Sequence, residues 1–212
     1  MRTTIPSLTL TLALVLGVGS LAEAQTREFE IRNDGGSRIQ FISDAPLETI
    51  TGVSSHVTGD VRVNPNDLSS ARGTVRVRVA SIRTGIDLRD EHLRSDNWLD
   101  AQAHPNATFE IRRVEGASQL QPNRSTRVRL HGRFSLHGVT RDVVANARVR
   151  LIPLNDELRR AHIDGDVIRA QASFDIELSD YDVSVPLPVR LKVSNEIRVN
   201  VTIRAIASDD ES

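Results

Sequence analysis

Apolar and polar residues alternate along most of this chain, and this period of two is the feature that most limits its fold. In Thr74-Val75-Arg76-Val77-Arg78-Val79, valine and arginine alternate strictly. Successive side chains of a β-strand point to opposite faces, so such a run predicts a strand with one buried face and one solvated face. The chain is therefore expected to be built mainly from strands.

Similar runs recur on both sides of this stretch and predict eight strands in a simple meander. Eight antiparallel strands can close into a barrel or stack as a sandwich, and the length of several runs favours the barrel. Residues 52–63 read as one long strand interrupted by glycines, which are typical of bends in curved sheets. The expected strands are 38–43, 52–63, 74–79, 108–112, 126–136, 143–152, 167–178 and 196–206.

The N-terminus predicts export. Residues 1–24 combine Arg2, an apolar run and the small-x-small sequence Ala22-Glu23-Ala24, which indicates a cleaved signal peptide. Threonine and glycine dilute the run below what a membrane-spanning helix needs. Residues 25–212 contain no repeat or linker, so we expect a single domain that is periplasmic or secreted and has at most peripheral contact with a membrane.

Composition narrows the classes of partner. The formal net charge is −1, so nucleic acid is not an expected ligand. The absence of cysteine excludes a disulfide framework and a thiol nucleophile. Whether two copies form a homodimer is left open by the sequence.

The expected inward faces of the strands mix small and large apolar residues. Alanine and glycine on these faces could fit the taper of a filled barrel, which would make the chain a non-binding interaction protein. They could equally leave a tunnel suited to an apolar chain, because an eight-stranded barrel has room for one small ligand. In that second interpretation the tunnel is lined by Phe41, Phe109, Phe134 and Phe174.

Residues 81–109 are the one long segment that does not read as strand or tight turn. We expect a short amphipathic helix there, with Asp87 as its N-cap and an end at His104-Pro105, because the residue before proline avoids helical angles. Such a helix would form a lid over one end of the barrel. Leu93 and Trp98 are its expected ligand-facing residues.

The charged residues of this segment have two interpretations. Arg89 and Asp90 are adjacent and are expected to form an ion pair that holds the lid helix. Alternatively, Arg83 and Arg89 stand near the expected mouth and could contact an anionic headgroup such as a phosphate.

Catalysis is a weaker hypothesis. An enzyme acting on a small apolar substrate could use Asp90 and His92 as base and acid, and Ser81 lies close in sequence. However, no nucleophile elbow of the GxSxG type occurs, and the six histidines lack the spacing of metal ligands such as HExxH. We therefore expect no catalytic residues, no metal site and no cofactor.

Two blocks of sequence resemble the signature of the YceI-like family. The first contains Ser81-Ile82-Arg83-Thr84-Gly85 and Arg89-Asp90-Glu91-His92-Leu93, and the second contains Leu136-His137-Gly138-Val139-Thr140. The combined pattern is far more specific than any one of its parts. The chain departs from the family where Asp182 follows Tyr181, a position at which the family often has glycine.

This resemblance implies an all-β fold, an eight-stranded antiparallel lipocalin-like barrel with one short helix in a long loop. It also implies a periplasmic protein that is not an enzyme and that sequesters or carries a long-chain isoprenoid lipid, either a polyisoprenoid or a lipid similar to an isoprenoid quinone. The residues expected to bind this lipid are Phe41, Leu93, Trp98, Phe109, Phe134, Leu136, Phe174, Arg83 and Arg89.

Overall fold

A computed structural model describes residues 26–208. The expected signal peptide, residues 1–24, lies outside the described residues. Within the described part, no helix is long and apolar enough to cross a membrane.

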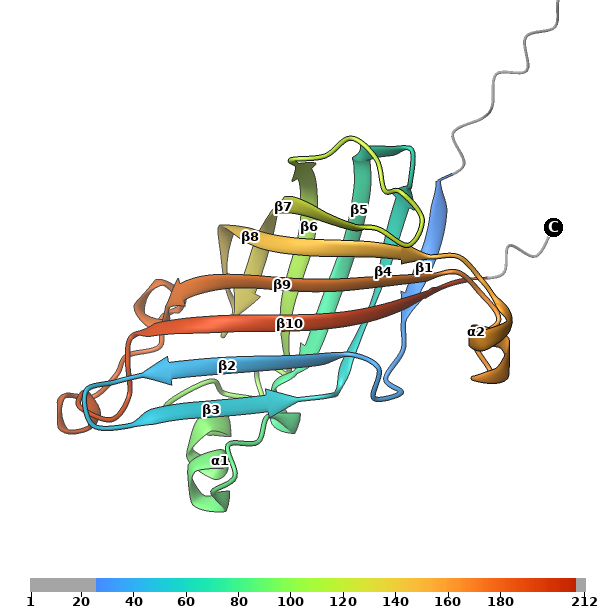
Figure 1. The fold of residues 1–212 in the computed structure, drawn as a ribbon. Coiled ribbons are helices and arrows are strands. Elements are labelled where there is room, and N and C mark those ends of the chain that lie inside the picture. The colour runs from blue at the N-terminus through green and yellow to red at the C-terminus, as the bar shows by residue number, and fades with distance from the viewer. Residues whose placement is uncertain (1–25, 209–212) are drawn as a thin grey trace, which may run out of the picture.

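Ten antiparallel strands form one coiled sheet in the described part of the chain (Figure 1). Their order is β1-β4-β5-β6-β7-β8-β9-β10-β2-β3, and an additional pairing of β1 with β10 closes an eight-stranded barrel. The strands are β1 (Arg27–Ile31), β2 (Arg38–Asp44), β3 (Thr49–Ser54), β4 (Val57–Asn64), β5 (Asp67–Arg78), β6 (Asn106–Glu115), β7 (Ser125–Leu136), β8 (Val139–Ile152), β9 (Val167–Glu177) and β10 (Glu196–Ala207).

The predicted fold class is confirmed, with two changes to the first strands. β1 was not predicted, although Phe29 and Ile31 alternate with polar residues and are fully buried. It pairs with the C-terminal end of β10, whereas β2 pairs with residues 197–202 of the same strand. The long strand predicted over residues 52–63 is divided between β3, which pairs with β2, and β4, which pairs with β1 and β5. The first position in the meander is thus shared by β1 and β2, which both pair with β10, and the second position is shared by β3 and β4.

Two α-helices lie outside the barrel wall. α1 (Asp87–Arg94) belongs to the segment between β5 and β6, and α2 (Asp156–Arg160) joins β8 to β9. In Figure 1, α2 lies near the C-terminal end of β10, away from the β2–β3 turn. Three short 3-10 helices complete the elements: η1 (Val79–Ser81), η2 (Leu178–Tyr181) and η3 (Leu187–Val189).

The position of α1 was predicted, but both of its expected ends were wrong. Ile86 is the N-cap and makes no side-chain cap hydrogen bond, while Asp87 is the first helical residue. The helix ends at Arg94, ten residues before His104, because the Ser95 N–H and Oγ both donate to the His92 carbonyl. The signal at Pro105 therefore marks the start of β6 rather than the end of the helix.

The turn after η2 accounts for the departure from the family pattern at Asp182. This residue has φ 57°, in the left-handed region that glycine enters without steric cost. Aspartate is among the non-glycine residues that tolerate this conformation best. The turn that leads from Tyr181 into residues 183–195 is thus kept without a glycine.

Candidate functional site

The barrel encloses an apolar cavity of about 620 Å³. Its wall is built from alternate residues of the strands, the ones that face inward, as β9 shows most clearly. The expected inward face of β9 and the residue that follows it all line the cavity: Ile168, Ala170, Ala172, Phe174, Ile176 and Leu178. The period of two in the sequence therefore places one continuous apolar face toward the lumen.

The cavity is closed at one end and reaches the surface at the other. At the closed end its lining residues are buried, among them Val63, Leu68 and Leu120. At the other end the lining includes Ile86 and Leu88, which are more than half exposed. We call this end the mouth.

Phenylalanine rings line the lumen without filling it. The ring centroids of Phe109 and Phe134 lie 5.6 Å and 5.2 Å from that of Phe174. Phe41 lies across from Gly52 on the neighbouring strand, and the ring of Phe109 lies beside Gly132. Because these glycines have no side chain, the rings can lie along the wall and leave the lumen open. The cavity thus disfavours the filled-barrel hypothesis.

The two glycines should differ in how well they tolerate a methyl group. A Cβ at Gly52 would lie 2.0 Å from Cε1 of Phe41, a side chain that can move into the lumen. A Cβ at Gly132 would lie 2.4 Å from the backbone oxygen of Glu110, which cannot move without shifting β6. We expect Gly52→Ala to cost about 1 kcal/mol of unfolding free energy and Gly132→Ala about 3 kcal/mol, measured by urea unfolding. Equal costs would contradict this account.

Eight of the nine residues predicted to bind a ligand line the cavity, and Arg83 does not. Arg83 is exposed and donates through Nη1 to the carbonyl oxygens of Ala80 and Ile82. Whether the other eight contact a ligand stays a prediction. They are Phe41, Leu93, Trp98, Phe109, Phe134, Leu136, Phe174 and Arg89.

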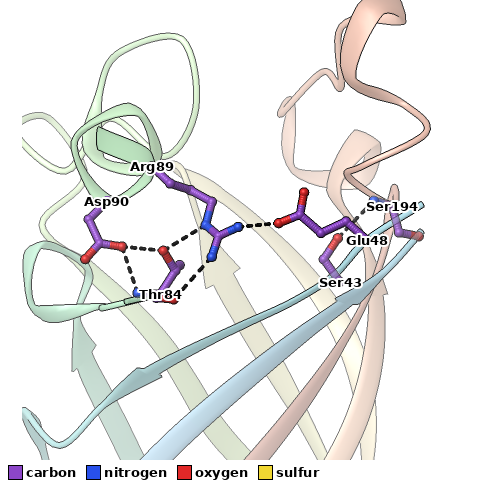
Figure 2. A network of polar contacts seen from close by, with 6 residues as sticks. All are labelled: Ser43, Glu48, Thr84, Arg89, Asp90 and Ser194. Atoms are coloured by element: carbon purple, nitrogen blue, oxygen red, sulfur yellow. Dashed lines mark hydrogen bonds and ion pairs between the residues drawn. The ribbon is translucent and has the colours of Figure 1, made fainter. Parts of the chain in front are cut away.

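A network of polar contacts ties α1 to the β2–β3 turn at the mouth (Figure 2). Arg89 donates from Nη1 to Glu48 Oε1 at 2.6 Å and from Nε to Thr84 Oγ1 at 2.9 Å. Thr84 in turn donates from its N–H and Oγ1 to Asp90 Oδ1, at 2.7 Å and 2.6 Å. Thr84 therefore accepts from one neighbour and donates to the other, which fixes the direction of its hydroxyl proton.

Further bonds tie the end of β2 and the β2–β3 turn to the loop of residues 183–195. The Ser194 N–H donates to Ser43 Oγ at 2.9 Å, and the Leu47 N–H donates to the Leu191 carbonyl at 2.8 Å. The turn thus lies between α1 on one side and this loop on the other (Figure 2). Together the three segments surround the mouth.

The carboxylate of Asp90 is buried, with 2% of the residue exposed. Burial raises the pKa of Asp90, but the two hydrogen bonds from Thr84 and the positive charges of Arg83 and Arg94 outweigh it. The pKa of Asp90 therefore lies below its ordinary value, and the carboxylate is ionised at neutral pH.

The predicted Arg89–Asp90 ion pair was wrong. Arg89 pairs with Glu48, which is 41 residues away in the sequence, and Asp90 is linked to Arg89 only through Thr84. Adjacent helical residues point in different directions, so Arg89 faces the cavity while Asp90 turns toward the 84–86 segment.

The proposed acid–base pair is not assembled at the cavity. His92 lines the cavity, whereas Asp90 does not and is held ionised by Thr84, which makes it a weak base. Ser81 hydrogen-bonds Ser54 and the Arg78 carbonyl instead of a histidine. Among residues 26–208, no group of three or more histidine, aspartate or glutamate side chains is arranged to hold a metal ion.

Several mouth residues were not found from the sequence. Glu48 lies in a turn and carries no local signal of its partner in α1. Pro186, Val189 and Lys192 line the cavity from the loop of residues 183–195, which has neither strand nor helix periodicity. The only available signal was an apolar, proline-containing sequence in a segment expected to be a loop.

Comparison with known proteins agrees with this architecture. The model of the YceI-like domain matches residues 31–205. The chain belongs to the YceI-like family. The match begins at the last residue of β1 and ends in β10, so nearly the whole YceI-like barrel is included.

Curated relatives of this YceI-like chain include UPF0312 proteins from Azotobacter vinelandii and Pseudomonas fluorescens. The protein from Azotobacter vinelandii is 29% identical over 140 residues, which cover 64% of this chain and 70% of the relative. The protein from Pseudomonas fluorescens is 30% identical over 139 residues, with coverage of 64% and 70%.

Solved structures show the same YceI-like fold at lower identity. A polyisoprenoid binding domain from Saccharophagus degradans superposes with a TM-score of 0.64 at 16% identity, covering 87% of this chain and 100% of that domain. BcnA from Burkholderia cenocepacia gives a TM-score of 0.64 at 15% identity, covering 82% and 98%. At these identities the similarity is one of fold.

Proposed function

We propose that this protein binds a long-chain isoprenoid lipid in the barrel cavity, and that it sequesters or carries this lipid in the periplasm. The observation that carries the proposal is the cavity itself, which is apolar along its length and open at one end. Its volume of about 620 Å³ lies within the range of small-molecule sites.

The shape of the cavity supports a chain-like ligand. Every second residue from Ile168 to Leu178 lines the wall. The distance along the strand between these two residues is about 33 Å at about 3.3 Å per residue. The cavity itself is shorter than this, because the strands of a barrel are tilted to its axis. A volume of about 620 Å³ spread along most of a strand is still narrow, which suits one extended chain better than a compact ring system. The solved polyisoprenoid binding domain with the same fold supports an isoprenoid as the class of chain.

The polar groups at the mouth support the orientation of this ligand. Glu48, Arg89 and Lys192 are the charged residues of the cavity lining, and none of them lies at the closed end. Apolar burial would drive binding of the tail, since each buried methylene contributes about 0.8 kcal/mol before ordering costs. A polar headgroup would remain at the mouth, where water and charged groups can solvate it.

The single tryptophan provides a direct test. Trp98 is the only tryptophan in the chain and lines the cavity. We expect titration with a long-chain polyprenol to shift Trp98 emission to shorter wavelength and to saturate at one ligand per protein, at micromolar concentration. The variant Trp98→Phe should lose the optical signal and still retain lipid in native mass spectrometry.

Two results would contradict the proposal. Protein purified from its own periplasm could carry no lipid in native mass spectrometry, and polyprenol could leave Trp98 emission unchanged. The location has its own test, which is the N-terminal sequence of the mature protein from the periplasmic fraction. Export with cleavage predicts that this sequence begins at Gln25.

A further inference from the structure

Large apolar side chains are exposed almost only around the mouth. Six such residues are more than 45% exposed in the described part of the chain, and five of them lie in the three segments that surround the mouth or directly before one of them. We call these five the rim: Leu47, Ile86, Leu88, Leu187 and Leu191. The sixth, Val144, lies on the wall strand β8. Single exposed apolar residues need no explanation, but a group gathered at one opening marks an interaction surface.

The rim is continuous with the cavity. Ile86 and Leu88 line the cavity themselves. Leu187 and Leu191 lie in the same stretch of chain as Pro186, Val189 and Lys192, which also line it. Leu47 is joined to Leu191 by a backbone hydrogen bond of 2.8 Å and precedes Glu48, a further lining residue. An apolar surface therefore runs from the outside of the molecule into the lumen without interruption.

The charge at the rim favours an anionic partner. Residues 186–194 contain Arg190 and Lys192 on either side of Leu191 and contain no acidic residue. Both basic residues are exposed. In the adjacent turn, the carboxylate of Glu48 is already paired with Arg89, so it opposes an anionic surface less than a free carboxylate would. Asp87 and Glu91 lie on α1, which places the net positive charge on the loop side of the mouth.

We propose that the rim docks on a membrane surface that contains anionic lipid. Residues 186–193 of the 183–195 loop and Leu47 insert first. Leucine tips enter the boundary between headgroups and acyl chains, and Arg190 and Lys192 contact the phosphates, as in other interfacial anchors. The mouth then faces the bilayer, so that a lipid can move into the cavity without crossing water. This inference rests on the proposed function in one respect only, which is that a lipid enters the cavity at the mouth.

Co-sedimentation of the mature protein with vesicles tests the inference. We expect binding to vesicles of phosphatidylglycerol and phosphatidylethanolamine in equal parts, and weaker binding when phosphatidylcholine replaces the phosphatidylglycerol. The double variant Leu187→Ser, Leu191→Ser should bind about tenfold more weakly, because two inserted side chains are lost. The matched control Val144→Ser removes an exposed apolar residue outside the rim and should bind like the native protein.

The charge contribution is tested separately with Lys192→Glu. This variant keeps the apolar rim and should lose affinity for the phosphatidylglycerol vesicles, and the loss should become smaller as salt is raised, since salt screens exposed charges. Because the chain has no cysteine, Leu191→Cys also provides a unique site for an environment-sensitive dye. Its emission should shift to shorter wavelength with vesicles, whereas a dye at Val144→Cys should not respond.

Several results would overturn the inference. The native protein could remain in the supernatant with anionic vesicles, or the double variant could bind as well as the native protein. Sedimentation velocity could instead show that the rim variants abolish a dimer, which would make a second copy the occupant of the rim. Failure here is distinguishable from failure of the proposed function, because polyprenol binding in solution is measured by Trp98 emission without vesicles.

Discussion

Replacing Ala172 by phenylalanine is expected to weaken isoprenoid binding about a hundredfold while leaving the barrel folded. Ala172 lies midway along β9 and lines the cavity. A phenyl ring there would displace the equivalent of about three to four ligand methylenes, which corresponds to about 3 kcal/mol of binding free energy. The change is measured by polyprenol titration of Trp98 emission and by thermal melting of the free protein.

The neighbouring residue provides a matched control for this experiment. Gln171 precedes Ala172 on β9 and is exposed on the outer face of the barrel. Gln171→Phe adds the same ring to the same strand and should leave affinity within about twofold of the native value, because strand neighbours face opposite sides. Equal loss of affinity in both variants would show that the ligand does not occupy the lumen at this level.

Replacing Asp90 by alanine is expected to give the largest loss of stability among the polar residues of the mouth. The substitution leaves the N–H and hydroxyl of Thr84 without their acceptor and removes a charge-assisted interaction. We expect a loss of about 3 kcal/mol, which corresponds to a fall in melting temperature of about 6–12 °C for a domain of this size. Asp87→Ala, an exposed carboxylate in the first turn of the same helix, should cost below about 1 kcal/mol.

The pH dependence of stability provides a second readout at Asp90. Its pKa is lower in the folded protein than in the unfolded chain, so ionised Asp90 stabilises the fold. This contribution is fully present above the ordinary carboxyl pKa of about 4 and is lost as the pH falls through the lower folded value. Asp90→Asn should therefore reduce the difference in stability between pH 7 and pH 3. An unchanged difference would contradict the assigned role.

The barrel wall could be predicted from the sequence because its pattern is local. Along β9, each inward residue from Ile168 to Leu178 follows from the period of two alone, and all six line the cavity. The same rule placed Phe109, Phe134 and Phe174 on the wall. What the pattern could not decide was whether the lumen is filled, because this depends on how the rings lie against glycines of neighbouring strands.

The mouth was harder to predict because its contacts join segments far apart in the sequence. Glu48 and Arg89 are separated by 41 residues, and no local pattern marks them as partners. The end of α1 depends on the hydrogen bonds of Ser95 rather than on the proline that follows later. Leu187 and Leu191 belong to a loop without periodicity, so their exposure became evident only from the structure.

The closed end of the barrel has a kinetic consequence for any transfer of lipid. Since the lining residues Val63, Leu68 and Leu120 are buried, a chain that enters at the mouth must leave by the same path, head first. Donor and acceptor would then compete for one face of the protein and could not both be engaged at once. Transfer would follow a shuttle mechanism. Its rate would reach a plateau as the concentration of either the donor membrane or the acceptor membrane is raised, and an excess of acceptor would inhibit loading from the donor.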